Sequence, residues 1–151
     1  MSESISFCER SEAGKIEDAT MFAPKYDANG LIVAVAIDHE TNEPLMLAYM
    51  NEESLKMTLE IQEAVYYSRS RQEIWHKGAT SGHVQKIKEI RTDCDQDALI
   101  LIVEQIGAGA CHTGRNSCFY RTVSVEEGQA VTQVAADSQM TFDAEEVYGK
   151  K

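Results

Sequence analysis

The chain has 151 residues, enough for one domain with a substantial core, and it is 43% hydrophobic and 26% charged. Its net charge of −11 argues against nucleic acid as a partner, because phosphate contacts need a basic footprint. The apolar run 31–37 is too short to span a bilayer, and the N-terminus lacks the basic start and apolar stretch of a secretory signal. We therefore expect a cytoplasmic protein with no membrane partner, in which the four cysteines serve a metal or catalysis rather than disulfides.

The first half of the chain predicts an N-terminal arm followed by a hairpin and a helix. Residues 1–24 are polar and acidic, which is compatible with a helix or a mobile arm. Residues 31–37 predict a buried strand, 38–44 a turn and 45–50 the returning strand of a hairpin. Asn51 is a good N-cap for a short helix, with Glu52 and Glu53 in its first turn and residues 54–61 as its continuation.

The second half predicts mostly strands. They are expected over residues 64–69, 73–76, 84–91 and 98–103, with a loop at 77–82 and a last strand at 117–125. The sum is an α+β fold, a mostly antiparallel sheet with a few short helices. We expect an arm over 1–24, a catalytic domain over 25–125 and a polar tail over 126–151 that ends in a short helix.

The segment 92–119 carries the strongest chemical signal, and it begins with three aspartates. If the piece is extended, Asp93, Asp95 and Asp97 share one face and Cys94 lies on the other. Three carboxylates on one face repel unless a hard divalent cation such as magnesium neutralises them. A calcium-binding loop is excluded because its sixth position needs glycine and is Ala98 here. A solvated acidic turn remains an alternative.

Three of the four cysteines fall in the same segment, at Cys94, Cys111 and Cys118. Three thiolates without a fourth would leave one coordination position of zinc open for water, which is typical of catalytic sites. Zinc lowers the pKa of such a water toward ~7. His112, next to Cys111, could transfer protons, although a lone histidine is more often structural. The alternative for the cysteines is packing as small buried hydrophobes; Cys8 has no predicted role.

Basic residues are concentrated between positions 69 and 91, in an otherwise acidic protein. This stretch contains six basic residues and only two acidic ones, Glu73 and Glu89. Such a surface suits a small anionic ligand, and a solvated charged face is the alternative. The candidate phosphate contacts are Arg69, Arg71, Lys77, Thr80 and Ser81, with Arg115 less specific. Trp75 could stack on a base or belong to the core.

With these motifs in view, the chain resembles phosphoribosyl-AMP cyclohydrolases. The resemblance rests on residues 44–51 (PLMLAYMN), 67–71 (YSRSR), 75–85 (WHKGATSGHVQ), 93–97 (DCDQD), 111–115 (CHTGR) and 117–119 (SCF). Ala79 departs from the pattern, since many relatives carry glutamate there. Two-domain members add a pyrophosphohydrolase domain, for which residues 124–151 are too few, so the single-activity form is expected.

The resemblance implies hydrolysis of the N1–C6 bond of the adenine ring of phosphoribosyl-AMP, in the third step of histidine biosynthesis. It also implies an intertwined homodimer that uses zinc and magnesium. Cys94, Cys111 and Cys118 match the zinc ligands, in a site shared between protomers. Asp93, Asp95 and Asp97 match the magnesium ligands.

The mechanistic hypothesis is that zinc-held hydroxide attacks C6 while His112 moves the proton. The basic residues, with Trp75 and Arg115, would hold the nucleotide substrate. A zinc-dependent deaminase is a second hypothesis, but its H-x-E and P-C-x-x-C pattern is absent. A non-enzymatic, zinc-stabilised binding module is a third, and it would need a closed metal site.

Overall fold

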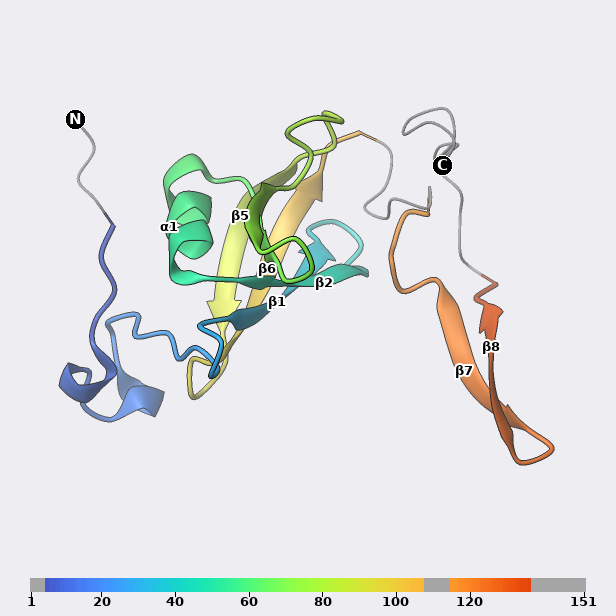
Figure 1. Cartoon of the computed structure of the whole chain (residues 1–151), viewed down its shortest axis with the longest axis horizontal. Helices are drawn as coiled ribbons and strands as arrows, with labels where there is room; N and C mark the ends of the chain where they lie inside the picture. The colour runs from blue at the N-terminus through green and yellow to red at the C-terminus, as the bar shows by residue number, and fades with distance from the viewer. Residues whose placement is uncertain (1–4, 108–114, 137–151) are drawn as a thin grey trace.

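Six strands form one mixed sheet in the order β4-β3-β2-β1-β6-β5, and two further strands, β7 and β8, pair as a separate hairpin (Figure 1). The computed structural model describes residues 5–107 and 115–136. The bounds of the strands are β1 Ile32–Asp38, β2 Pro44–Met50, β3 Val65–Ser68, β4 Glu73–His76, β5 Gln85–Thr92, β6 Ala98–Gln105, β7 Arg121–Glu126 and β8 Gln129–Val134. The α-helix α1 spans Glu52–Ile61, and two 3₁₀ turns span Arg10–Glu12 and Ile16–Asp18. This confirms an α+β fold that is mostly β-sheet.

The sheet is antiparallel except between β1 and β6, which run parallel with Val33 beside Ala98. The predicted hairpin over 31–50 is confirmed as β1 and β2. At its turn, the Asp38 carboxylate accepts hydrogen bonds from the backbone N–H groups of Glu40 and Thr41, which fixes the chain reversal. The strands predicted at 64–69, 73–76, 84–91 and 98–103 are also present.

Helix α1 begins at a reciprocal cap, as the sequence predicts. The Asn51 side chain accepts a hydrogen bond from the Ser54 N–H at 2.8 Å, and the Ser54 hydroxyl accepts one from the Asn51 N–H at 3.0 Å. The helix ends at Gln62, which has a left-handed backbone with φ of 60°. No described helix is long and apolar enough to cross a membrane.

The core lies between α1 and one face of the sheet. Alternate residues of β1, Ile32, Ala34 and Ala36, point to this face and are buried with Leu55 of α1. Their neighbours across the sheet are Met46, Met50, Leu99 and Leu101. The hydrophobic contact between helix and sheet stabilises this side of the domain.

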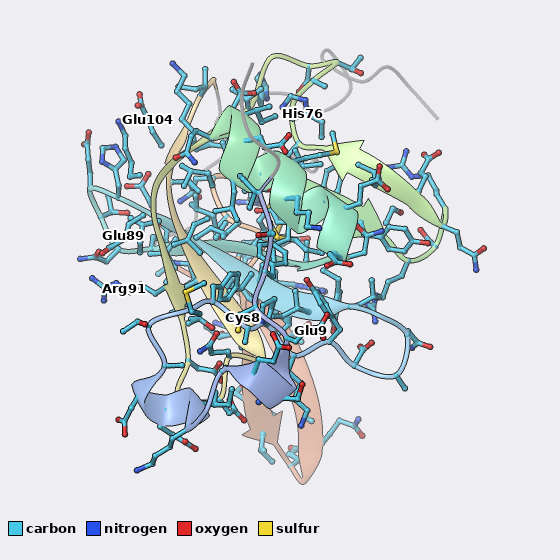
Figure 2. The ribbon with its side chains drawn as sticks, turned by 90° about the vertical axis from the view of Figure 1, so that its left-hand side faces the viewer. Cys8, Glu9, His76, Glu89, Arg91 and Glu104 are labelled. Atoms are coloured by element: carbon cyan, nitrogen blue, oxygen red, sulfur yellow. The ribbon has the colours of Figure 1, made fainter. Side chains whose placement is uncertain are left out.

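The other face of the sheet stays open within the described chain. It presents the alternate residues Val35, Leu47 and Ile100, which lie side by side in register. Leu47 is 46% exposed and Ile100 is 37% exposed. At the sheet edge, β5 carries an exposed Glu89–Arg91 pair, whose charges discourage further strand pairing (Figure 2).

The end of the described chain differs from the prediction. The strand expected over 117–125 is shorter, beginning at Arg121, and it is not the last, because β8 follows it. The turn at Glu127-Gly128 allows the reversal, as both residues have positive φ. Strand β8 was not predicted because the hairpin has no buried face, so its sequence does not alternate between apolar and polar residues in the usual way. Val123 and Val125 of β7 are each 74% exposed, and Val134 of β8 is 47% exposed. The helix predicted at the end of 126–151 lies outside the described residues.

Within residues 5–24, the structure has short 3₁₀ turns and no α-helix, which was one of the two forms expected for this segment. The segment forms two such turns and packs on the domain. Phe7 and Phe22 meet edge to face, with ring centroids 5.3 Å apart, and both pack against the core cluster. Cys8 and Glu9 lie on this segment, below α1 in the view of Figure 2.

Candidate functional site

The three aspartates converge in the loop between β5 and β6. A carboxylate oxygen from each of Asp93, Asp95 and Asp97 lies within 4.8 Å of those from the other two. The premise of an extended segment is wrong, because residues 94–97 form a turn. The carboxylates meet because the chain curls around them, and alternation along a strand plays no part.

Backbone geometry fixes this turn. The Asp93 carboxylate accepts hydrogen bonds from the N–H groups of Asp97 at 2.9 Å and Ala98 at 3.1 Å. Gln96 adopts a left-handed backbone with φ of 58°, and its N–H donates to the Asp93 carbonyl at 3.1 Å. Hydrogen bonds within the loop itself therefore close the turn, through the Asp93 carboxylate and the Asp93 carbonyl.

Residues 10–25 of the N-terminal segment hold the same turn through hydrogen bonds, and we name these contacts the N-terminal clasp. The side-chain oxygen of Gln96, a residue only 5% exposed, accepts a hydrogen bond from the Ala23 N–H at 2.7 Å. The Gln96 carbonyl accepts another from the Lys25 N–H at 2.8 Å. Arg10 donates to the carbonyls of Ala23 and Asp95, both at 2.9 Å. Residues 10–25 thus help to position the aspartates, a role that the sequence did not reveal.

Crowding of the carboxylates perturbs their titration. Hydrogen bonds shared with Asp93 and Asp95, together with their negative charge, raise the pKa of Asp97 to about 6. For Asp93, partial burial works to raise the pKa, but hydrogen bonds from Asp97, Asp95 and two backbone N–H groups outweigh it and lower the pKa. One proton held among three carboxylates is what a divalent cation would displace.

The structure separates two of the three predicted zinc ligands within one chain. Cys94 lies in the aspartate loop, which enters β6 at Ala98, opposite Val33 near the start of β1. Cys118 is anchored elsewhere: its N–H donates to the Leu45 carbonyl at 2.7 Å, and Leu45 lies beside the end of β1. The two anchoring positions on β1 are three or four residues apart, which is roughly 10 to 13 Å along a strand. Both thiols are exposed; Cys111 and His112 lie outside the described residues.

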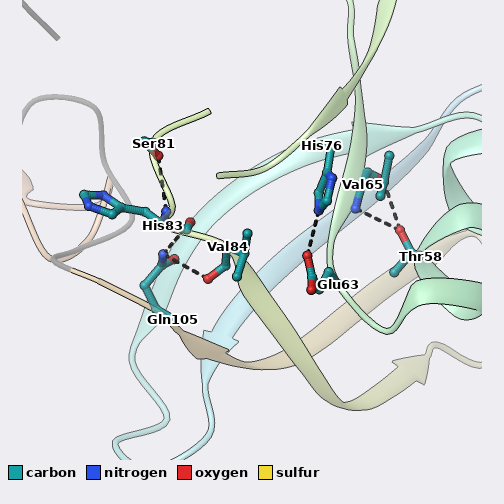
Figure 3. A network of polar contacts seen from close by, with 8 residues as sticks. All are labelled: Thr58, Glu63, Val65, His76, Ser81, His83, Val84 and Gln105. Atoms are coloured by element: carbon teal, nitrogen blue, oxygen red, sulfur yellow. Dashed lines mark hydrogen bonds and ion pairs between the residues drawn. The ribbon is translucent and has the colours of Figure 1, made fainter. Parts of the chain in front are cut away.

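The predicted phosphate loop over 77–82 is a turn that packs on the start of β5. A Cβ at Gly78 would collide with the backbone of His83, so only glycine fits there. Ser81 accepts a hydrogen bond from the His83 N–H at 3.3 Å, and the Gln105 side chain donates to the His83 carbonyl at 2.9 Å (Figure 3). Thr80 is exposed, whereas Lys77 is 6% exposed, with its ammonium 5.5 Å from the centroid of the Trp75 ring.

The remaining predicted contacts are dispersed. The Arg69 guanidinium lies 4.1 Å from the Tyr49 ring centroid, and Arg71 pairs with Glu73 at 3.4 Å. Trp75 is half-buried against Tyr66, as its core alternative requires. Arg115 lies 5.3 Å from the Tyr120 ring centroid.

One half-buried polar pair was not predicted from the sequence. His76 of β4 meets Glu63 at 2.8 Å, and separately the Thr58 hydroxyl accepts a hydrogen bond from the Val65 N–H at 2.9 Å (Figure 3). Nothing in the spacing of His76 and Glu63 signals this contact, since it depends on the register of β3 and β4.

Comparison with known proteins places this geometry in context. The family model described as phosphoribosyl-AMP cyclohydrolase matches residues 46–120. The chain is 48% identical over 149 residues to the phosphoribosyl-AMP cyclohydrolase of Rhodopseudomonas palustris (strain TIE-1), covering 99% of each chain. It is 52% identical over 141 residues to the enzyme of that name from Nitrobacter hamburgensis, covering 93% of this chain and 95% of the relative. For that from Agrobacterium fabrum, the identity is 54% over 134 residues, with 88% and 89% covered.

Proposed function

Because the chain belongs to the phosphoribosyl-AMP cyclohydrolase family, we propose that it opens the adenine ring of phosphoribosyl-AMP by hydrolysis of the N1–C6 bond, using zinc and magnesium held by its own side chains. It is a hydrolase of histidine biosynthesis that acts on a C–N bond of a cyclic amidine. The observation that carries the activity is the match over 99% of the chain to a relative of that name.

Cys94, Cys111 and Cys118 would hold the zinc. Cys94 and Cys118 suit it because both thiols are exposed and sulfur is a ligand that a borderline-soft cation favours. Bound zinc would lower the pKa of a coordinated water toward ~7 and so supply a nucleophile at neutral pH. Ribosylation at N1 makes C6 of the substrate more electrophilic. His112 would accept the proton of the attacking water and return it to the departing N1.

A second copy of the chain would complete this zinc site. By strand register, the segments that carry Cys94 and Cys118 are anchored at opposite ends of β1, which favours a site in which the two thiols come from different chains. The open sheet face around Leu47 and Ile100 offers an apolar surface for a partner. The β7–β8 hairpin does too, since a two-stranded hairpin with its valines exposed is marginally stable alone. An intertwined homodimer would cover both surfaces.

Asp93, Asp95 and Asp97 would hold the magnesium. Their oxygens already converge within 4.8 Å, and oxygen donors are the ligands that this hard cation prefers. A bound cation would also replace the proton shared with Asp93 and Asp95, whose hydrogen bonds and negative charge raise the pKa of Asp97 to about 6. The aspartate loop contains Cys94 as well, so the two metals would lie close to each other.

The basic residues would hold the phosphates of the substrate against the acidic charge of the protein. Arg69 and Lys77 are the stronger candidates on geometry, since both lie against aromatic rings that shape their position. Arg71 is engaged with Glu73, and Thr80, Ser81, Trp75 and Arg115 would contribute secondary contacts.

The test is an ultraviolet assay of ring opening with phosphoribosyl-AMP on protein of measured zinc content, with and without a zinc chelator. Turnover that chelator abolishes before the fold melts is the expected result. Absence of turnover in folded, zinc-loaded dimer would contradict the proposal. Chelator that unfolds such inactive protein would favour a binding module, and release of ammonia from adenosine would favour a deaminase.

A further inference from the structure

A groove of about 430 Å³ lies beside the aspartate loop, and no residue predicted from the sequence other than Asp97 lines it. Its volume falls in the range of small-molecule sites, roughly 300 to 1,000 Å³. The walls come from the segment before β1, from β1 itself, from the end of β2 and from Asp97. The groove therefore adjoins the proposed magnesium site directly.

One wall of the groove is apolar and held in place. Val33 and Tyr49 lie opposite each other in the β1–β2 register, and both line the groove with Leu31. The Arg69 guanidinium lies 4.1 Å from the Tyr49 ring centroid, so a cation–π contact restrains the ring. Such a wall suits the carbon skeleton of a sugar or the face of a base.

The opposite side supplies a cation. Lys25 is tied to the aspartate loop by its backbone, since its N–H donates to the Gln96 carbonyl at 2.8 Å. Among the residues that the structure describes, its ammonium makes no ion pair. The acidic neighbour Asp27 accepts backbone hydrogen bonds from Asn29 and Leu31 through one carboxylate oxygen, which directs its charge into the turn before β1.

Tyr26 supplies part of the groove wall. Its side chain packs against the core cluster, and its hydroxyl is buried. Burial, and secondly the charge of Glu52 at the start of α1, raises the pKa of Tyr26, so the phenol keeps its proton.

We propose that this groove binds a phosphorylated ribose of the substrate, with Lys25 and the cation held by Asp97 meeting the phosphate and Tyr49 forming the wall beside the sugar. This inference rests on the proposed function for the identity of the substrate. Binding needs the divalent cation, because without it the carboxylate of Asp97 repels the phosphate. The anion thus binds as one unit with the metal.

The first test measures the binding of ribose 5-phosphate to the zinc-loaded dimer by calorimetry, with and without magnesium. The expected result is binding that requires magnesium and weakens about tenfold or more in Lys25→Met, since a charge-assisted contact is lost. Lys15→Met is the matched control, because Lys15 is an exposed lysine of the same segment whose ion pair among residues 5–107 and 115–136 is with Asp18, and it should bind as the unchanged protein does.

Kinetics with phosphoribosyl-AMP give the second readout. Lys25→Met should raise KM far more than it lowers kcat, because the groove holds a part of the substrate remote from C6. Magnesium-independent binding of ribose 5-phosphate, no binding to the unchanged protein, or equal affinity in Lys25→Met would each overturn the groove assignment. If the unchanged protein opens the ring in any of those cases, the proposed function still stands. If ribose 5-phosphate binds as predicted but the protein does not open the ring of phosphoribosyl-AMP, the proposed function is contradicted and the anion site stands.

Discussion

Replacing Gln96 with alanine tests whether the N-terminal clasp stabilises the aspartate loop. The Gln96 side chain accepts the hydrogen bond of the Ala23 N–H at 2.7 Å, and Ala23 is fully buried. Truncation leaves that N–H without a partner and without access to water, which costs about 1 to 3 kcal/mol. We expect the free energy of unfolding to fall by this amount, measured by urea denaturation at fixed protein concentration.

Gln62 provides a matched control for this change. It is also a glutamine with a left-handed backbone, with φ of 60° against 58° for Gln96, but it is exposed. Gln62→Ala therefore carries the same backbone cost without the buried hydrogen bond, since the Gln62 side chain donates to the nearby Leu59 carbonyl at the protein surface. The difference between the two variants isolates the clasp.

The clasp should also affect metal binding, because Gln96 stands between Asp95 and Asp97. We expect the affinity for Mn²⁺, followed by its paramagnetic resonance signal, to fall about tenfold in Gln96→Ala and to stay unchanged in Gln62→Ala. Unfolding free energies of the two variants that agree within about 0.5 kcal/mol, together with equal Mn²⁺ affinity, would refute the reasoning.

Three further predictions concern the cap, the core and the titration of the aspartates. Asn51→Ala removes one half of the reciprocal cap with Ser54 and should cost about 1 kcal/mol in urea unfolding; a loss below 0.3 would contradict the role of the cap. Tyr66→Phe leaves the buried Gln85 side-chain oxygen without the phenol that donates to it at 2.6 Å, so it should cost about 1 to 3 kcal/mol, whereas the neighbouring Tyr67→Phe should be near neutral. Since the pKa of Asp97 is raised to about 6, the metal-free fold binds an extra proton between about pH 4 and 6, and its stability falls as the pH rises through that window. Magnesium affinity, measured by calorimetry, should then weaken about tenfold for each pH unit below 6, and a flat profile would argue against Asp97 as a ligand.

Most of the sheet could be predicted from the sequence because local pattern and burial agree there. The run 31–37 is apolar because β1 is central in the sheet, and Asn51 is a sufficient signal for the helix start. Strand β8 could not be predicted in this way. Its side chains find no buried face in the described chain, so its sequence carries no period of burial.

The site was predictable in its chemistry but not in its assembly. The spacing of Asp93, Asp95 and Asp97 indicates a cluster, yet the turn that forms it depends on the left-handed backbone of Gln96. The contribution of Arg10 and Lys25 depends on contacts across more than 70 positions of sequence, which no local pattern encodes. The roles of Cys111 and His112, and the division of the chain at residues 24 and 125, stay predictions.

The most direct test of the account is complementation between two inactive variants, because the proposed zinc site takes Cys94 from one chain and Cys118 from its partner. Cys94→Ser and Cys118→Ser should each abolish ring opening of phosphoribosyl-AMP. Unfolded and refolded together in equal amounts with zinc, they should form one intact site in each mixed dimer, and so recover about one quarter of the unchanged activity. No recovery in mixed dimers confirmed by native mass spectrometry would contradict a zinc site shared between two chains.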